Sequence, residues 1–214
     1  MSEESTDLIL QRIMKLHPKI IDLTLDRVLK LLKKLGNPEK KLPPVIHVAG
    51  TNGKGSTQAI IKSGLEANGK TVHAYTSPHL IRFNDRINLL GKPISEPHLN
   101  EVLEDCYRAN DGLPITYFEI TTVAAILAFS KVEADFCILE VGLGGRYDAT
   151  NIIDRPELCV ITPISLDHQK LLGETIEEIA FDQGYLYKLI TLIITIVVFI
   201  IFIMMMRNNI NQYF

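Results

Sequence analysis

One stretch of this sequence has the residue types and the spacing that bind phosphate. A short run rich in β-branched residues, 45–49, leads into a glycine-rich loop with one lysine, and a helix-forming segment follows at 58–66. Glycines let main-chain N–H groups converge on one point, a helix N-terminus adds partial positive charge, and a lysine reaches the outer phosphates. We therefore expect a nucleoside triphosphate to contact Gly50, Thr51, Asn52, Gly53, Lys54, Gly55 and Ser56.

The loop is a shortened form of the usual phosphate-binding pattern. Val48 stands where that pattern has its first glycine, and Gly55 stands where it has serine or threonine. A glycine-rich turn that binds nothing is the alternative. The strand before the loop and the helix after it favour phosphate binding.

Two further groups that can do chemistry follow strands of their own. Glu140 ends the apolar run 135–140, which precedes a second glycine-rich loop at 141–151, and His168 follows the run 158–162. Parallel strands bring their carboxyl ends to one edge of a sheet, where such folds bind ligands. A lone carboxylate or histidine is more often structural. In the company of a phosphate loop, Lys54, Glu140 and His168 become candidates for one site.

The remaining pattern supplies the elements that position these groups. Apolar spacing predicts helices at 7–16, 24–35, 95–110, 116–130 and 175–181, and strands at 45–49, 71–75, 135–140 and 158–162. The helix at 116–130 has Ile120, Val123, Ala124, Leu127 and Ala128 on one face, and we expect it to be a core helix. The polar segment 76–87 begins at the carboxyl end of a strand, where such sheets bind ligands, and a solvated connection is the alternative. Strands that alternate with helices imply right-handed crossovers, so the fold class is α/β with an open, mostly parallel sheet.

Composition narrows the partners and the compartment. The chain has 214 residues and a net charge of −3, which excludes the basic footprint of a nucleic-acid-binding protein. Its three widely spaced cysteines fit reduced thiols in a cytoplasmic protein, and the acidic N-terminus lacks the apolar run of a signal peptide. We expect a monomer that acts on small molecules.

Five segments together resemble the N-terminal part of the folylpolyglutamate synthases, including the bifunctional dihydrofolate synthases, within the Mur-type ligases. The segments are 50–56, 77–80, 118–119, 140–151 and 165–168, and they occur in the family's order. The resemblance implies a Mur-ligase-type P-loop fold and an ATP-dependent ligase of one-carbon metabolism and folate biosynthesis. Such an enzyme phosphorylates a carboxylate of folate or dihydropteroate, and the amine of L-glutamate then displaces the phosphate to form an amide.

The resemblance also implies roles for single residues. Lys54 would contact the outer phosphates of ATP, and it is the first catalytic candidate, with His168 the second. Mg²⁺ would be held by Ser56, Ser77 and Glu140, with His168 on a second ion. The pterin site would be formed by Leu16, His17, Pro18, Lys19, Thr116, Tyr117, Phe118, Glu119, Tyr147, Asp148 and Ala149.

The resemblance ends near residue 183. The family has a lysine, modified to a carbamate that holds the second Mg²⁺, where this chain has Gln183, which cannot form a carbamate. We therefore divide the chain into a partial ligase-like domain, 1–183, and an unrelated apolar tail, 184–214. The uncharged run 189–206 gives the tail a candidate membrane-spanning helix at 187–206. A tail anchor and an accidental translation product are the two explanations, and the abrupt change favours the second.

Three functions remain open. The first is a folylpolyglutamate synthase domain that is truncated and impaired. The second is a non-catalytic remnant that binds nucleotide or is tethered to a membrane. The third is a ligase of another Mur-type branch that acts on a cell-wall precursor, and the segments at 118–119 and 148–151 argue against it.

Overall fold

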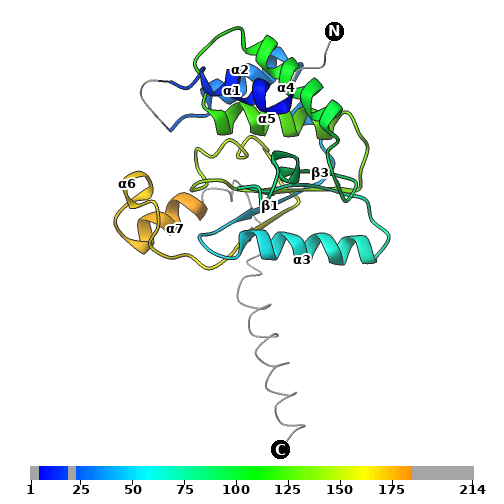
Figure 1. Ribbon diagram of the computed structural model, residues 1–214. Helices are drawn as coiled ribbons and strands as arrows, with labels where there is room; N and C mark the ends of the chain where they lie inside the picture. The colour runs from blue at the N-terminus through cyan, green and yellow to red at the C-terminus, as the bar shows by residue number, and fades with distance from the viewer. Residues whose placement is uncertain (1–4, 19–22, 185–214) are drawn as a thin grey trace, which may run out of the picture.

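Six strands form one sheet in the computed structural model, which describes residues 5–18 and 23–184. Their order across the sheet is β4-β3-β2-β5-β1-β6 (Figure 1). The strands are β1 (Val45–Ala49), β2 (Val72–Tyr75), β3 (Ile87–Leu89), β4 (Lys92–Pro93), β5 (Phe136–Glu140) and β6 (Leu158–Ile161). Strands β2, β5, β1 and β6 pair in parallel, whereas β3 and β4 are antiparallel. The predicted α/β class with a mostly parallel sheet is confirmed.

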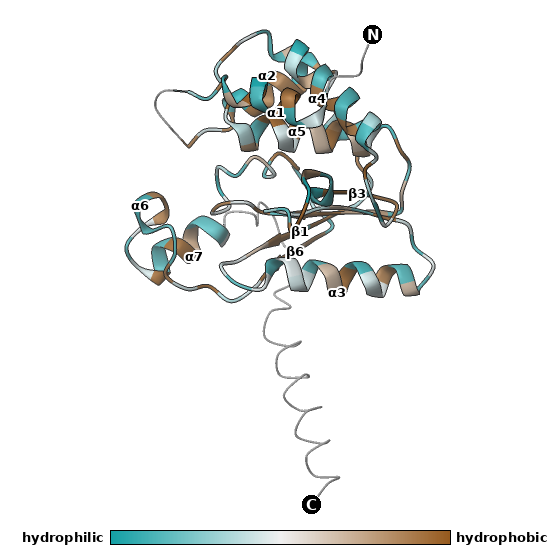
Figure 2. Cartoon of the chain, in the orientation of Figure 1, coloured by the Kyte–Doolittle hydropathy of each residue, from teal (hydrophilic) through white to brown (hydrophobic). Residues whose placement is uncertain are grey.

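Helices cover both faces of the sheet. They are α1 (Thr6–Met14), α2 (Asp26–Lys34), α3 (Lys54–Ala67), α4 (Glu96–Asn110), α5 (Tyr117–Ser130), α6 (Gln169–Leu172) and α7 (Ile176–Gly184), with 3₁₀ turns η1 (Pro38–Lys41) and η2 (Phe83–Arg86). Figure 1 shows α1, α2, α4 and α5 above the sheet and α3 below it. The strands between these layers are apolar, as Figure 2 shows, because a parallel sheet covered on both faces has no solvated side.

Helix α5 is buried on all sides, so it is a core helix as expected, and its burial extends beyond the face that the apolar spacing marked. Thr121 and Thr122 are as inaccessible as Val123 on the predicted face. The helix packs against α1, α2 and α4 on one side and against the sheet region on the other. A helix that is apolar all round belongs in such an interior position. Thr121 satisfies its hydroxyl by donating to the carbonyl oxygen of Tyr117, at 2.8 Å.

The segment 76–87 is more ordered than the solvated connection that its charge suggested. It contains η2 and leads directly into β3, and Phe83 within it is buried. One oxygen of the Asp85 carboxylate accepts hydrogen bonds from the main-chain N–H groups of Ile81 and Arg82, at 3.0 and 2.9 Å. The carboxylate of Asp85 thus stabilises the turn, while the ring of Phe83 packs into the core.

The apolar run 189–206 and the candidate membrane-spanning helix at 187–206 lie outside the described residues. Within residues 5–18 and 23–184, no helix is long and apolar enough to cross a bilayer.

Buried His73 makes the stability of the fold depend on pH. Its ring stacks on Phe129 with centroids 5.1 Å apart, and its Nε2 lies 2.9 Å from the carbonyl oxygen of Val132. Burial lowers the pKa of His73 below its usual 6.5, and the hydrogen bond to Val132 opposes that shift. The unfolded chain therefore binds a proton more readily than the folded protein does, and stability rises with pH between the two pKa values.

We expect the free energy of unfolding to fall as the pH drops below the usual pKa of histidine, 6.5, because His73 takes up a proton more readily in the unfolded chain. Urea unfolding at several pH values, in the wild type and in His73→Gln, measures this contribution. The variant is less stable throughout, but its stability should change less over this range of pH. An identical pH dependence in the two proteins would contradict the assignment.

Candidate functional site

The predicted phosphate loop lies between β1 and α3, at the carboxyl edge of the sheet. Gly50 has a φ of 128° and packs so tightly on Thr162 that a side chain there would overlap it. Gly53 has a φ of 85° and caps α3. The loop amides of Thr51 and Asn52 donate to the carbonyl oxygen of Pro163. These bonds fix the loop against the end of β6, so its shape does not depend on a ligand.

Lys54 lies in the loop, at the first turn of α3. Its Nζ donates to the carbonyl oxygens of Gly50 and Thr51, at 2.8 and 3.2 Å. The N–H groups of this first turn have no acceptor inside the helix by geometry. The ammonium group and these N–H groups lie at the end of the helix that the sequence analysis assigns to phosphate, and such an end favours anions.

Glu140 ends β5 and faces this loop from the neighbouring strand. Its carboxylate accepts a close hydrogen bond from the hydroxyl of Thr76 and one from the N–H of Ser77, and a side chain at Gly55 would lie 3.8 Å from it. Burial raises the pKa of Glu140, while these hydrogen bonds and the charge of Lys54 act in the opposite direction. A divalent cation would offset the cost of keeping this carboxylate ionised.

A cavity of about 650 Å³, here called the phosphate-loop cavity, lies between part of the loop and Glu140, and Lys54 is not among its lining residues. It is lined by Gly53, Gly55, Ser56, Gln58, Ala59, Lys62, Ala74, Thr76, Ser77, Pro78, Leu80, Asp85, Asn88 and Glu140. Three predicted metal ligands, Ser56, Ser77 and Glu140, are thus brought together. Hydroxyl and carboxylate oxygens are the donors that Mg²⁺ and similar hard cations prefer, so these residues fit such an ion.

His168 is not brought into this cavity. Its segment reaches the phosphate loop through Ser165, whose N–H donates to the hydroxyl of Thr51 at 3.1 Å. The imidazole itself is largely exposed at the start of α6, 3.7 Å from the carboxylate of Asp167. Across residues 5–18 and 23–184, no three acidic, histidine or cysteine side chains cluster as a metal site would require.

Gln183 lies buried in the last turn of α7. The glycine-rich loop packs against this turn, and the N–H of Gly145 donates to the carboxylate of Asp182 at 2.8 Å. The Oε1 of Gln183 is buried without a hydrogen-bond partner. The carbonyl oxygen of this amide, at the position where the resemblance predicts a lysine, therefore has no hydrogen-bond partner among the described residues.

A second cavity, of about 330 Å³, lies beside the first and is here called the Phe118 cavity. It is lined by Leu23, Thr24, Arg27, Ser77, Pro78, Arg86, Thr116, Phe118, Glu119, Gly142, Leu143, Tyr147, Asp148 and Ala149. Six residues predicted for the substrate site are among these: Thr116, Phe118, Glu119, Tyr147, Asp148 and Ala149. Ser77 and Pro78 line both cavities, so they form the boundary between them.

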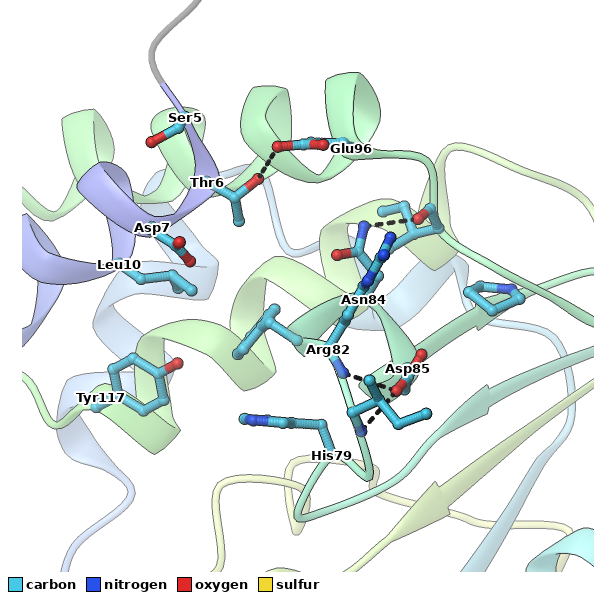
Figure 3. A pocket seen from close by; sticks show the side chains of 14 residues that line it. Ser5, Thr6, Asp7, Leu10, His79, Arg82, Asn84, Asp85, Glu96 and Tyr117 are labelled. Atoms are coloured by element: carbon cyan, nitrogen blue, oxygen red, sulfur yellow. Dashed lines mark hydrogen bonds between the residues drawn. The ribbon is translucent and has the colours of Figure 1, made fainter.

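The other predicted substrate residues lie elsewhere. Leu16, His17 and Pro18 line neither cavity, although the carbonyl oxygen of Leu16 accepts a hydrogen bond from the N–H of Ile115, next to Thr116. Lys19 is outside the described residues. Tyr117 points into a third cavity of about 790 Å³, between α1 and the loop before β3, where Asp7 and Arg82 also lie (Figure 3).

Glu119 holds two parts of the Phe118 cavity together. It accepts the N–H of Thr116 at 2.7 Å, and Thr116 in turn accepts the N–H of Glu119, which is a capping box at the start of α5. The guanidinium of Arg27 donates to both carboxylate oxygens, at 3.0 to 3.1 Å. The spacing Thr-x-x-Glu is the sequence signal for such a cap. The ion pair with Arg27, 92 positions away, had no signal in the sequence.

Asp148 organises the glycine-rich loop from inside. One carboxylate oxygen accepts the N–H groups of Gly142 and Leu143, and the other accepts the N–H and the hydroxyl of Thr150, all at 2.6 to 3.0 Å. The hydroxyl of Thr150 also lies 2.7 Å from Nε2 of His47 on β1. Burial raises the pKa of Asp148, and these hydrogen bonds oppose that shift. Asp148 therefore links strand β1, through Thr150, to the wall of the cavity.

Comparison with known proteins places the chain among ligases. The Mur ligase middle domain model matches residues 48–200, a range that extends past residue 183. The dihydrofolate synthase/folylpolyglutamate synthase of Bacillus subtilis is 46% identical over 176 residues, which are 77% of this chain and 39% of that protein. The Escherichia coli protein of the same description is 41% identical over 173 residues, or 81% of this chain and 40% of the relative.

Solved structures agree with these matches. The E. coli FolC structure in complex with DHPP and ADP has a TM-score of 0.81 and 39% identity, and covers 86% of this chain and 44% of that chain. A structure described as an FPGS-AMPPCP-folate complex has a TM-score of 0.79 and 38% identity. The chain thus spans about two fifths of the length of the curated relatives that it matches.

Proposed function

We propose that this chain, which belongs to the folylpolyglutamate and dihydrofolate synthase branch of the Mur ligase family, takes part in the ATP-dependent ligation of L-glutamate to a folate. The acceptor is folate or dihydropteroate, and the reaction passes through an acyl phosphate. Since the chain spans only about two fifths of its relatives' length, the complete reaction is part of this proposal. We also propose that the protein is a monomer and acts in the cytoplasm. Its three buried free thiols fit a reducing compartment.

The observation that carries the proposal is the shared wall of the two cavities. Ser77 and Pro78 face a phosphate loop on one side and a cavity walled by Phe118 and Tyr147 on the other. A flat aromatic acceptor suits the second cavity, and a triphosphate suits the first. An acceptor carboxylate at the boundary would lie next to the phosphoryl group that it must receive, and such positioning supplies a large part of the catalysis.

The residues of the phosphate loop and of the two cavities have complementary roles in this proposal. Lys54 binds the outer phosphates, and Ser56, Ser77 and Glu140 hold Mg²⁺, which screens the repulsion between a carboxylate and a triphosphate. Thr116, Phe118, Glu119, Tyr147 and Asp148 shape the acceptor site. For His168 we retain the proposed role on a second ion, although its imidazole lies outside the lining of the phosphate-loop cavity and Gln183 cannot supply a carbamate.

A glutamate-dependent assay decides between this function and a nucleotide-binding remnant. ADP release is measured with ATP, Mg²⁺ and dihydropteroate, with and without L-glutamate, and ATP binding is measured on the same sample. Release that depends on glutamate supports the ligase. Bound ATP with no release that depends on glutamate would leave the remnant as the function of this chain.

Replacing Gly142 tests the acceptor cavity alone. A side chain at Gly142 would overlap the ring of Phe118, so Gly142→Ala should weaken dihydropteroate binding at least tenfold while ATP affinity stays within about twofold. Fluorescence titration measures both affinities. The matched control is Gly64→Ala on α3, where the added methyl group meets no atom within 4 Å. Equal loss of both ligands would contradict the division into two cavities.

A further inference from the structure

Arg86 is the second arginine of the Phe118 cavity, and its position is set by three neighbours. The carbonyl oxygen of Arg86 accepts a hydrogen bond from the N–H of Thr76 at 2.9 Å. The hydroxyl of Thr76 in turn donates to Glu140, so Arg86 lies close to that carboxylate's surroundings through its main chain. Its Nε donates to Nδ1 of His79 at 3.0 Å, and its guanidinium carbon lies 5.3 Å from the centre of the Phe83 ring. The side chain is therefore held in place by a histidine and an aromatic ring.

The charges of the cavity show why Arg86 differs from Arg27. Arg27 is neutralised by two bonds to Glu119, and the oxygens of Asp148 are occupied by four donors of their own loop. Arg86 contacts no carboxylate within residues 5–18 and 23–184. A guanidinium has five N–H donors, and only Nε is used here. The terminal N–H groups remain available to a ligand.

The place of Arg86 in the cavity matches the reacting end of an acceptor. It shares the lining with Ser77 and Pro78, the two residues that also line the phosphate-loop cavity. Arginine binds a carboxylate through two parallel hydrogen bonds, which fix its orientation as well as its position. A carboxylate bound there would stand at the boundary across which phosphoryl transfer must occur.

We propose that Arg86, supported by His79 and Phe83, binds the carboxylate of the acceptor at the boundary of the two cavities and so selects acids over neutral analogues. This assignment rests on the proposed function. It makes Arg86 a specificity-determining residue that contacts the substrate, while Arg27 remains a structural partner of Glu119.

The test compares dihydropteroate with its methyl ester, which has the same rings and lacks the negative charge. Both are titrated by fluorescence against the full chain, the variants Arg86→Gln and Arg86→Lys, and the control Arg82→Gln. Arg82 precedes η2 and lines the Tyr117-containing cavity instead. We expect wild type and Arg82→Gln to bind the acid roughly 10- to 100-fold more tightly than the ester. Arg86→Gln should bind both equally, and Arg86→Lys should recover part of the preference.

Each other result overturns a defined part of the argument. An unchanged preference in Arg86→Gln, or an equal loss of both ligands, refutes the role of Arg86 and leaves the proposed function intact. If wild type binds neither compound while it still binds ATP, the acceptor itself is wrong, and the role of Arg86 is refuted with it. Thermal unfolding of each variant shows whether an equal loss of both ligands arises from misfolding. If Arg86→Gln is misfolded, the preference of Arg86→Lys for the acid over the ester decides the role of Arg86.

Discussion

Replacing Lys54 by alanine is expected to lower the affinity for ATP by roughly 100-fold. In the structure its ammonium group lies 2.8 and 3.2 Å from two carbonyl oxygens of the loop, so it already stands within the phosphate-binding turn. A charge-assisted hydrogen bond to a phosphate is worth about 1.5–3 kcal/mol, and a lysine at this place makes at least one. Isothermal titration with a non-hydrolysable ATP analogue measures the loss.

Lys62→Ala is the matched control for this experiment. Lys62 lies on the same helix and lines the phosphate-loop cavity, and its ammonium group is paired with Glu66 at 2.9 Å. Its removal should change ATP affinity by less than about threefold, as for an exposed pair. If Lys54→Ala binds the analogue as tightly as wild type does, the loop is a glycine-rich turn that binds no phosphate.

Replacing Asp148 by alanine is expected to lower the free energy of unfolding by about 3–5 kcal/mol. The substitution removes the acceptor of three main-chain N–H groups, of which that of Thr150 is buried and those of Gly142 and Leu143 are partly buried. Each buried donor left without a partner costs about 1–3 kcal/mol. The hydroxyl of Thr150 loses the same acceptor, which disturbs its contact with His47.

Urea unfolding followed by circular dichroism measures this loss. The control is Asp154→Ala, an exposed aspartate a few residues further along the same segment, for which we expect a change of less than about 0.5 kcal/mol. Equal stability of Asp148→Ala and Asp154→Ala would mean that the glycine-rich loop does not depend on its buried carboxylate. The acceptor site would then need another support.

Asp148 also shows that a family resemblance can predict where a residue lies without predicting what its side chain contacts. The resemblance put Asp148 in the pterin site, and the structure puts it in the wall of the Phe118 cavity. Its two oxygens nevertheless accept four hydrogen bonds from the loop itself, three from main-chain N–H groups and one from the hydroxyl of Thr150. Glu119 behaves in the same way. Both acids shape the cavity, whereas the proposed contact with the ligand's carboxylate is made by Arg86.

The sequence by itself determined the order of the elements and the groups at their ends. Strand β1, the glycine-rich loop and helix α3 follow from local rules, because β-branched runs, glycines and apolar spacing act over a few residues. The carboxylate at the end of β5 follows from the same reasoning, since a parallel sheet aligns its carboxyl ends. These local signals placed Ser56 and Glu140 at one edge of the sheet, and the family resemblance added Ser77; all three line one cavity in the structure.

Only the tertiary structure decided which polar side chains already have partners within the fold. Arg27 meets Glu119 across 92 positions, and His47 meets Thr150 across 103, and no local pattern encodes such pairs. Residues 76–87 read as solvent-exposed because their charges are dense, yet the fold uses Asp85 to build a turn and buries Phe83 beneath it. His168 stays at the surface although its strand ends on the expected edge. Whether a polar group is free for a ligand depends on the neighbours that folding brings to it, and those neighbours are distant in sequence.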